Sequence, residues 1–295
     1  MINSNTWSLG RAALAAVVLV TWLTGWTASA CAEPVAMVTD VQGKAVLASD
    51  ARKRELTILA ELEPGARVQL PAGARLVAIY LKSGDEYSMS GPALVEFGAT
   101  EPAAASGAKP AKRGNPLAQG GAAIRIKPVG VTQAAIVMRS MRPAARIRLL
   151  SLSGTHTLEA QPEFRWQELQ PGVKYQFEIS DDTGRTLHEA QIDATSLRLP
   201  SGVQLREGVP YTWEVSTRLP DGRKYSNAGD FSIATADLRV QAEALRPAAS
   251  APLSTRIAYA AWLEQMELKD EARKYWKAAW TERPEDPRLR ALAEQ

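Results

Sequence analysis

The chain has 295 residues, of which 45% are hydrophobic and 23% charged, and its formal net charge is +3. A chain of this length is longer than one typical domain with a single hydrophobic core, and it is consistent with two or three domains. The composition is typical of a soluble globular protein. A net charge this small excludes a strongly basic protein that binds nucleic acid through its overall charge.

Residues 1–32 have the pattern of a secretory signal. Arg11 is the only charge before Glu33, and it precedes an apolar stretch that continues to Leu23 and gives way to small residues. The apolar run of about a dozen residues is shorter than the roughly 20 that span a bilayer. We therefore expect an exported protein, in the periplasm or at the outer membrane as a lipoprotein; an uncleaved membrane anchor is the alternative.

Two processing sites compete near Cys31. Cleavage after Ala32 would use Ala30 and Ala32 as the small residues, whereas Ala28-Ser29-Ala30-Cys31 resembles a bacterial lipobox with Ala28 in place of the usual Leu. In the second case Cys31 would carry the lipid, and the membrane would be reached only through that anchor. Cys31 is the only cysteine, so no internal disulfide, thiolate nucleophile or cysteine metal cluster is expected.

Residues 33–100 predict a first β-domain. Short strand-like segments alternate with turns rich in Gly and Pro, which favours an antiparallel sandwich or barrel. Strands are expected at 35–41, 44–48, 56–59, 67–70, 75–81, 86–89 and 93–97.

Three motifs give this region a family resemblance. They are Val38-x-x-Val41-x-Gly43, Leu62-x-x-Gly65-x-x-Val68-x-Leu70-x-x-Gly73, and Gly84-Asp85-Glu86-Tyr87-x-x-x-Gly91-Pro92 followed by Phe97. The stretch resembles the FecR-type periplasmic domain. Signalling members of that family have a cytoplasmic anti-sigma segment before a membrane helix. Only ten residues precede Arg11, so the resemblance does not imply direct control of a sigma factor.

Residues 101–121 are rich in Ala, Pro and Gly and have no apolar periodicity, which predicts a flexible linker or insertion. Strand-like sequence resumes within 122–142 and would complete the first sheet. Between Glu101 and Glu159 the chain has many cations and no acidic residue. This pattern fits solvated strand edges or, alternatively, a patch for an anionic ligand such as a lipid head group or cell-wall polymer, comprising Arg125, Lys127, Arg139, Arg142, Arg146 and Arg148.

Residues 145–235 predict a second β-domain. Tyr175-x-Phe177-x-Ile179 and Tyr211-x-Trp213-x-Val215 alternate strictly, so one face of each strand should enter a core. Together with Pro162-Glu163-Phe164-Arg165-Trp166, these segments resemble a fibronectin type III or immunoglobulin-like domain. That resemblance implies a spacer or contact surface.

Residues 236–295 change to a helical period. Helices are expected near 238–245 and 254–267, with a third capped by Asp270 that ends before Pro284 and another opening at Asp286-Pro287. Ala260, Ala272, Trp276, Ala279 and Pro284 have the spacing of a tetratricopeptide repeat, which the segment resembles, although Arg256 stands at the early Trp position.

One such repeat cannot bury its own apolar face. It must pack on a neighbouring helix, on the preceding domain or on another protein. Trp280 follows Trp276 by four residues on the same helix face and is a candidate partner contact.

The search for reactive groups gives no catalytic constellation. His156 and His188 are the only histidines and have no ligand partners at metal-binding spacing, and Asp181-Asp182 belongs to a turn. No cofactor, metal or nucleic acid is expected. A glycosidase, the least favoured reading, would need two carboxylates facing each other.

The sequence therefore predicts a mainly β fold with two antiparallel β-domains followed by a short α-helical hairpin. We expect a non-enzymatic envelope scaffold that binds protein or cell-wall ligands. The alternative is a periplasmic ligand-sensing component that acts through a separate membrane partner.

Overall fold

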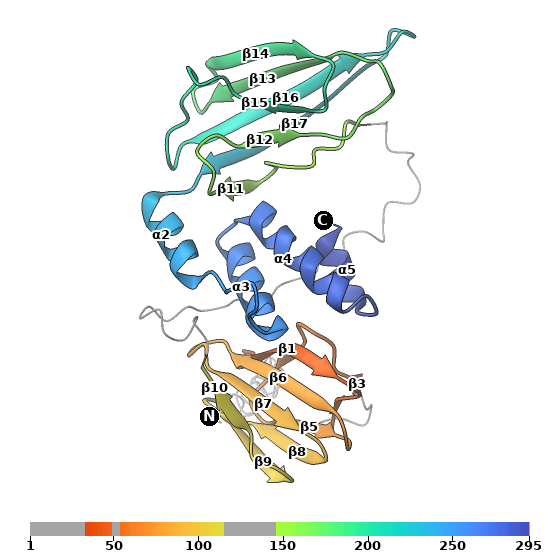
Figure 1. The fold of residues 1–295 in the computed structure, drawn as a ribbon, viewed down its shortest axis with the longest axis vertical. Helices are drawn as coiled ribbons and strands as arrows, with labels where there is room; N and C mark the ends of the chain where they lie inside the picture. The colour runs from red at the N-terminus through yellow and green to blue at the C-terminus, as the bar shows by residue number, and fades with distance from the viewer. Residues whose placement is uncertain (1–32, 49–53, 115–145, 295) are drawn as a thin grey trace, which may run out of the picture. The chain divides into compact units, whose positions relative to one another are not determined.

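Two five-stranded antiparallel sheets build the first β-domain of the computed structural model, which describes residues 33–48, 54–114 and 146–294 (Figure 1). One sheet has the order β10-β7-β6-β1-β4, with β1 (Ala36–Gln42), β4 (Glu61–Leu62), β6 (Arg75–Tyr80), β7 (Glu86–Ser90) and β10 (Ala111–Arg113). The other has the order β3-β2-β5-β8-β9, with β2 (Val46–Leu47), β3 (Arg54–Glu55), β5 (Ala66–Leu70), β8 (Ala93–Phe97) and β9 (Pro102–Ser106). Alternating side chains of β5 and β8 enter a common core, as the sequence predicts.

The predicted linker at 101–121 is wrong for the part that the structure describes. Residues 102–106 form β9, which pairs with β8, and residues 111–113 form β10, which pairs with β7. Both are edge strands with mostly exposed side chains. Backbone hydrogen bonds hold both strands, and Lys112 and Arg113 of β10 also form ion pairs with Asp85 at 2.9 Å and Glu86 at 3.3 Å. Because these contacts are polar, no apolar alternation marks the strands in the sequence.

The predicted strand at 56–59 is also wrong, because these residues form a turn. The amide groups of Leu56 and Leu59 donate to Ala45 O and Val38 O at 2.8 Å, and Leu59 has a φ of 63°. Ile58 and Leu59 are buried against the helices. Their apolar character therefore reflects burial, not strand pairing.

A second β-domain follows residue 145. Its main sheet has the order β11-β17-β16-β13-β14, with β11 (Thr155–Thr157), β13 (Tyr175–Asp181), β14 (Thr186–Ile192), β16 (Pro210–Arg218) and β17 (Lys224–Ile233). β12 (Glu163–Arg165) and β15 (Ser196–Arg198) form a separate antiparallel pair. β11 runs parallel to β17, and the other pairs are antiparallel. The predicted alternation is confirmed, since Phe177, Trp213 and Trp166 are at most 1% exposed.

Four helices follow β17 in the described residues: α2 (Ala236–Leu245), α3 (Leu253–Gln265), α4 (Lys269–Glu282) and α5 (Pro287–Ala293). The mainly β fold with a helical C-terminal segment is thus confirmed. Asp286 caps α5 as the sequence predicts, but Asp270 does not cap α4. Leu268 is the N-cap residue, and the Asp270 carboxylate instead accepts a hydrogen bond from the Leu152 amide.

The helices share a hydrophobic core with the first β-domain. Ten of the 13 residues of α3 are buried, and their core includes Met37, Ile79 and Leu81. Arg288 Nη1 donates to Leu59 O at 2.8 Å, and Ser254 Oγ donates to buried Glu86 at 3.2 Å. The helical segment therefore covers its apolar face with neighbouring helices and with a domain far earlier in the chain.

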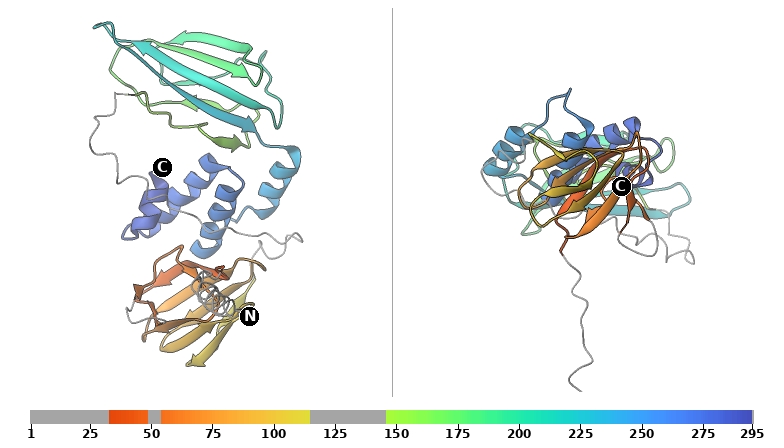
Figure 2. Two further views of the ribbon diagram at one scale, coloured as in Figure 1. Left: turned by 180° about the vertical axis from the view of Figure 1, so that it is seen from behind. Right: turned by 90° about the horizontal axis from the view of Figure 1, so that it is seen from below.

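The α3–α4 turn makes the corresponding contacts with the second β-domain. The carbonyl of Glu267 accepts the His156 amide at 2.7 Å and the Thr155 hydroxyl at 2.9 Å. α3 and α4 lie side by side, as the front view of Figure 1 and the view from behind in Figure 2 show. One helix pair thus contacts both β-domains.

Candidate functional site

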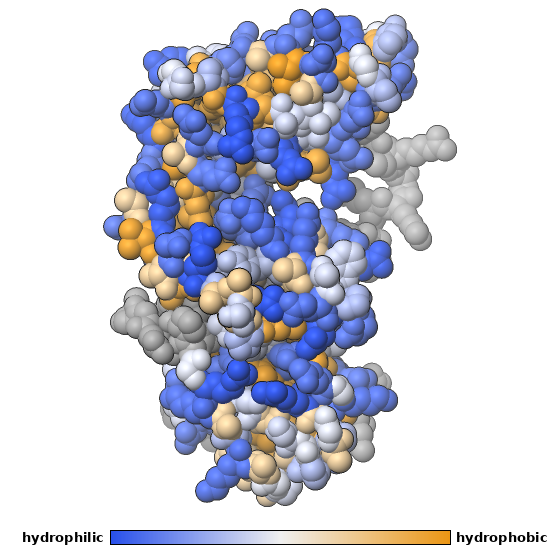
Figure 3. Space-filling model, viewed as in Figure 1, coloured by the Kyte–Doolittle hydropathy of each residue, from blue (hydrophilic) through white to orange (hydrophobic). Residues whose placement is uncertain are grey.

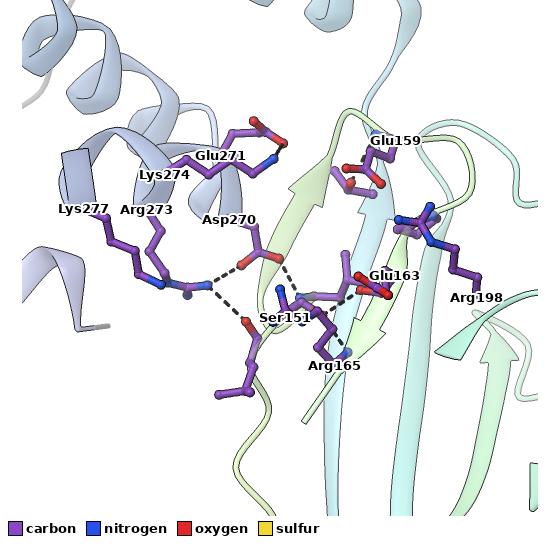
Figure 4. A pocket seen from close by; sticks show the side chains of 14 residues that line it. Ser151, Glu159, Glu163, Arg165, Arg198, Asp270, Glu271, Arg273, Lys274 and Lys277 are labelled. Atoms are coloured by element: carbon purple, nitrogen blue, oxygen red, sulfur yellow. Dashed lines mark hydrogen bonds and ion pairs between the residues drawn. The ribbon is translucent and has the colours of Figure 1, made fainter. Parts of the chain in front are cut away.

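A cleft of about 210 Å³ lies where α4 faces the β12–β15 strand pair (Figure 4). The charged side chains that line it come from the second β-domain and from α4. The acidic residues are Glu159, Glu163, Asp270 and Glu271, and the basic residues are Arg165, Arg198, Arg273, Lys274 and Lys277. We call this site the α4–β12 cleft.

Strand and helix periodicities explain why these side chains gather. Phe164 enters the core of the second β-domain, so Glu163 and Arg165 on either side of it point to the opposite face of β12. On α4, Ala272, Trp276 and Ala279 are buried, which leaves the 270, 273, 274 and 277 positions for the cleft.

Two hydrogen bonds to backbone groups tie the walls of the cleft together. Asp270 Oδ2 accepts the Leu152 amide at 2.7 Å, and Arg273 Nη1 donates to Leu150 O at 3.4 Å. Arg273 also pairs with Asp270 Oδ1 at 2.7 Å. The carboxylate and the guanidinium therefore neutralise each other while they hold the 150–152 segment against α4.

The remaining charges of the cleft divide into paired and unpaired groups. Glu271 pairs with Lys274 at 2.6 Å. Within the described part of the chain, Arg165, Arg198, Lys277, Glu159 and Glu163 make no ion pair, and Arg198 has only a 3.5 Å hydrogen bond to a backbone carbonyl. Three cations and two carboxylates are thus open to a charged ligand.

A second cavity, of about 270 Å³, adjoins this cleft and shares Leu150, Ser151, Asp270 and Arg273 with it. Glu264 lines it and accepts a hydrogen bond from Trp276 Nε1 at 3.1 Å. Burial raises the pKa of Glu264 above its usual value, and the Trp276 bond opposes that rise.

Most of the predicted basic patch lies outside the described residues, namely Arg125, Lys127, Arg139 and Arg142, as does the predicted lipidation site Cys31. Arg146 and Arg148 are exposed. Arg148 Nη2 donates to Glu294 O at 3.0 Å, which links the start of the second β-domain to the end of α5. The structure therefore brings Arg148 to the helices.

Trp280, the predicted partner contact, is partly buried against the helical core. Its Nε1 is buried and has no hydrogen-bond partner among the described residues. More of this indole therefore packs inside the chain than the sequence alone suggests. The most exposed large apolar side chain described is Val240 of α2, at 70%. Figure 3 shows hydrophobic residues on this face of the molecule over the α2 region.

His156, one of the two histidines of the sequence, is partly buried in the structure. Its Nδ1 lies 2.5 Å from Ser232 Oγ, and its Nε2 lies 3.6 Å from Glu267 Oε2. His156 therefore belongs to the contact between β11 and the α3–α4 turn. No group of three or more His, Cys, Asp or Glu residues with the proximity for a metal ion occurs in the described ranges.

Arg165, Arg198 and Lys277 were not singled out by sequence reasoning. Alternation around Phe164 and Leu197 indicates that the arginines face outward, but no local signal brings them to α4, which begins at Lys269, far beyond both arginines in the chain. Among the residues that the structure describes, no helix combines the length and apolar character needed to cross a bilayer.

Comparison with known proteins leaves the family open. No protein-family model matches the chain, and no curated protein matches it. Among solved structures, CopC from Methylosinus trichosporium OB3b is similar over 30% of this chain and 94% of its own, with 21% identity and a TM-score of 0.23. A likeness at this level carries no argument about function.

Proposed function

We propose that this chain is an exported, non-enzymatic binding protein of the cell envelope that acts as a scaffold for protein or cell-wall ligands. The main support for this proposal is that the helices contact both β-domains. These contacts order surfaces of the two β-domains and of the helices before any ligand binds. Such pre-ordering lowers the entropy cost of binding.

Export rests on the signal pattern of residues 1–32, and the periplasm or a lipid anchor at Cys31 follows from it. The family resemblances supply the module types, with a FecR-type domain first, a fibronectin- or immunoglobulin-like domain second and a tetratricopeptide-like hairpin last. Because α3 is buried on nearly all sides, we expect the outward faces of α2 and α4, not α3, to meet partners.

The experiment is expression of the unaltered chain in a bacterium, followed by cell fractionation, mass spectrometry of the N-terminus and crosslinking in intact cells. We expect an N-terminus processed near Cys31 and a reproducible crosslinked partner in the envelope fraction. An unprocessed cytosolic product, or turnover of a substrate by the purified protein, would contradict the proposal.

The identity of the crosslinked partner separates a scaffold from a sensor. Recovery of cell-wall fragments or a structural envelope protein supports the scaffold. Recovery of a membrane signalling protein, with a small ligand that alters the crosslinking yield, would assign the sensory role instead.

A further inference from the structure

We infer that the α4–β12 cleft binds an extended polypeptide segment of a partner protein in which acidic side chains outnumber basic ones. This inference rests on the proposed function and names the ligand of one of its surfaces. It follows from the spacing of two arginines, from the mixed sign of the unpaired charges and from the size of the cleft.

The two arginines have the spacing of an extended peptide. Arg165 lies opposite Ser196 and Arg198 lies opposite Glu163, so the arginines are diagonal neighbours across the β12–β15 pair. Such neighbours are about 7 Å apart, close to the roughly 6.6 Å between alternate side chains of a β-strand. Carboxylates at positions i and i+2 of an extended segment can therefore each meet a guanidinium, whose planar donors match a carboxylate in bidentate geometry.

The acidic groups at the cleft argue against a uniform polyanion. Glu159 and Glu163 line the same cleft as the arginines and make no ion pair among the described residues. A phosphate polymer would place like charges against both, which costs binding free energy. A polypeptide can instead offer basic side chains or backbone amides to these carboxylates.

The shape of the cleft also favours a chain that lies across it. At about 210 Å³ it is smaller than the roughly 300–1,000 Å³ of pockets that enclose whole small ligands. Leu150, 41% exposed at its rim, offers an apolar contact beside the charges. Lys277, on the α4 wall, provides a third cation for an acidic side chain further along the segment.

The test uses the protein purified after export and three fluorescent probes: poly-L-glutamate, polyphosphate, and a glutamate–lysine copolymer with glutamate in excess. Binding is measured by fluorescence anisotropy at two salt concentrations. We expect the copolymer to bind at least as well as either polyanion. In the Arg165→Gln/Arg198→Gln variant its affinity should fall at least about tenfold, since two charge-assisted contacts are lost.

The matched control is Arg218→Gln/Lys224→Gln, which removes the same charge from an exposed cross-strand pair on β16 and β17. We expect the control to keep wild-type affinity within about twofold. Equal losses in both variants would reduce the effect to net charge and overturn the inference. Preferred binding of polyphosphate would also overturn it in favour of a phosphate polymer.

A second variant, Lys277→Glu, keeps the test decisive if the arginine variant folds poorly. It alters the α4 wall alone and should also weaken copolymer binding. Crosslinking in intact cells distinguishes failure of the cleft assignment from failure of the proposed function. If the cleft variants retain the wild-type envelope partner, the cleft assignment fails and the proposed function stands; if the wild type captures no partner, the proposed function itself fails.

Discussion

Gly229 of β17 lies beside the Leu152 carbonyl and the Trp213 indole. Trp213 Nε1 donates to Leu152 O at 2.7 Å, and a Cβ at position 229 would lie 2.8 Å from that oxygen and 2.9 Å from Nε1. We expect Gly229→Ala to lower the free energy of unfolding by about 1–3 kcal/mol, because the buried backbone and indole must move apart. Urea unfolding measures this loss.

The control for Gly229 is Gly202→Ala, since no atom lies within 4 Å of a Cβ at that position. Its effect should stay within about 0.5 kcal/mol. Equal stability of the two variants would show that the β17 contact is looser than described.

Asp181 makes the second β-domain sensitive to acid. Its carboxylate accepts hydrogen bonds from the Thr183 hydroxyl at 2.6 Å and from the amides of Thr183 and Arg185 at 3.1 Å. The Thr183 hydroxyl is the main cause that holds the pKa of Asp181 below its ordinary 3.8, and the Arg185 charge adds to it. The stabilisation is therefore complete above about pH 3.8 and is lost as the pH falls through the lower folded value.

We therefore expect the Asp181→Asn variant to lose less stability than the wild type as the pH falls below 3.8. Thermal unfolding followed from pH 7 to pH 2.5 would measure the difference between the wild type and the variant. Asp182→Asn is the matched control, because the neighbouring carboxylate is exposed and makes none of these hydrogen bonds. A wild-type acid response in Asp181→Asn would rule out this assignment.

At the scale of single elements, α5 depends on its cap. Asp286 Oδ1 accepts the amides of Arg288 at 2.8 Å and Leu289 at 3.1 Å. A helix of seven residues is marginal without such bonds. We expect Asp286→Ala to cost about 1 kcal/mol and to speed hydrogen exchange at both amides. Glu285→Ala, next to it and exposed, should leave that exchange unchanged.

Element prediction succeeds where side chains alone define the structure. Alternation in β13 and β16 and the Asp286-Pro287 helix start were readable because each is a local pattern. β9 and β10 were not, since Ala and Lys side chains at a sheet edge carry no periodic signal. The turn at 56–59 was misread because burial of Ile58 against a distant helix produces the same apolar run as a strand.

At the scale of the whole molecule, the shared core should couple domains that are separate in sequence. All the tryptophans that the structure describes lie beyond residue 145, whereas Ile79 belongs to the first β-domain and packs with the helices. We expect Ile79→Ala to cost about 2–5 kcal/mol and to shift the unfolding transition seen by tryptophan fluorescence. An unchanged fluorescence transition, with a shift only in circular dichroism, would mean that the modules unfold independently.

The cleft could be predicted only in part. The sequence indicates that Arg165 and Arg198 face away from the core, and that 270, 273, 274 and 277 share a helix face. Their meeting depends on Asp270 accepting the Leu152 amide, a contact across 118 positions that no local pattern encodes. The position of Asp270 at the start of a predicted helix made it a candidate N-cap. Its carboxylate instead accepts the hydrogen bond from Leu152 and so links α4 to the second β-domain.

The late position of α3 has a consequence for biogenesis. A polypeptide is synthesised from its N-terminus, so Met37, Ile79 and Leu81 are made long before the residues of α3–α5 that cover them. During that interval the early sheet exposes an apolar face and is vulnerable to aggregation. Assembly of this core is therefore expected to finish only after α3–α5 have been made, so truncation before residue 253 should leave the first β-domain prone to aggregation.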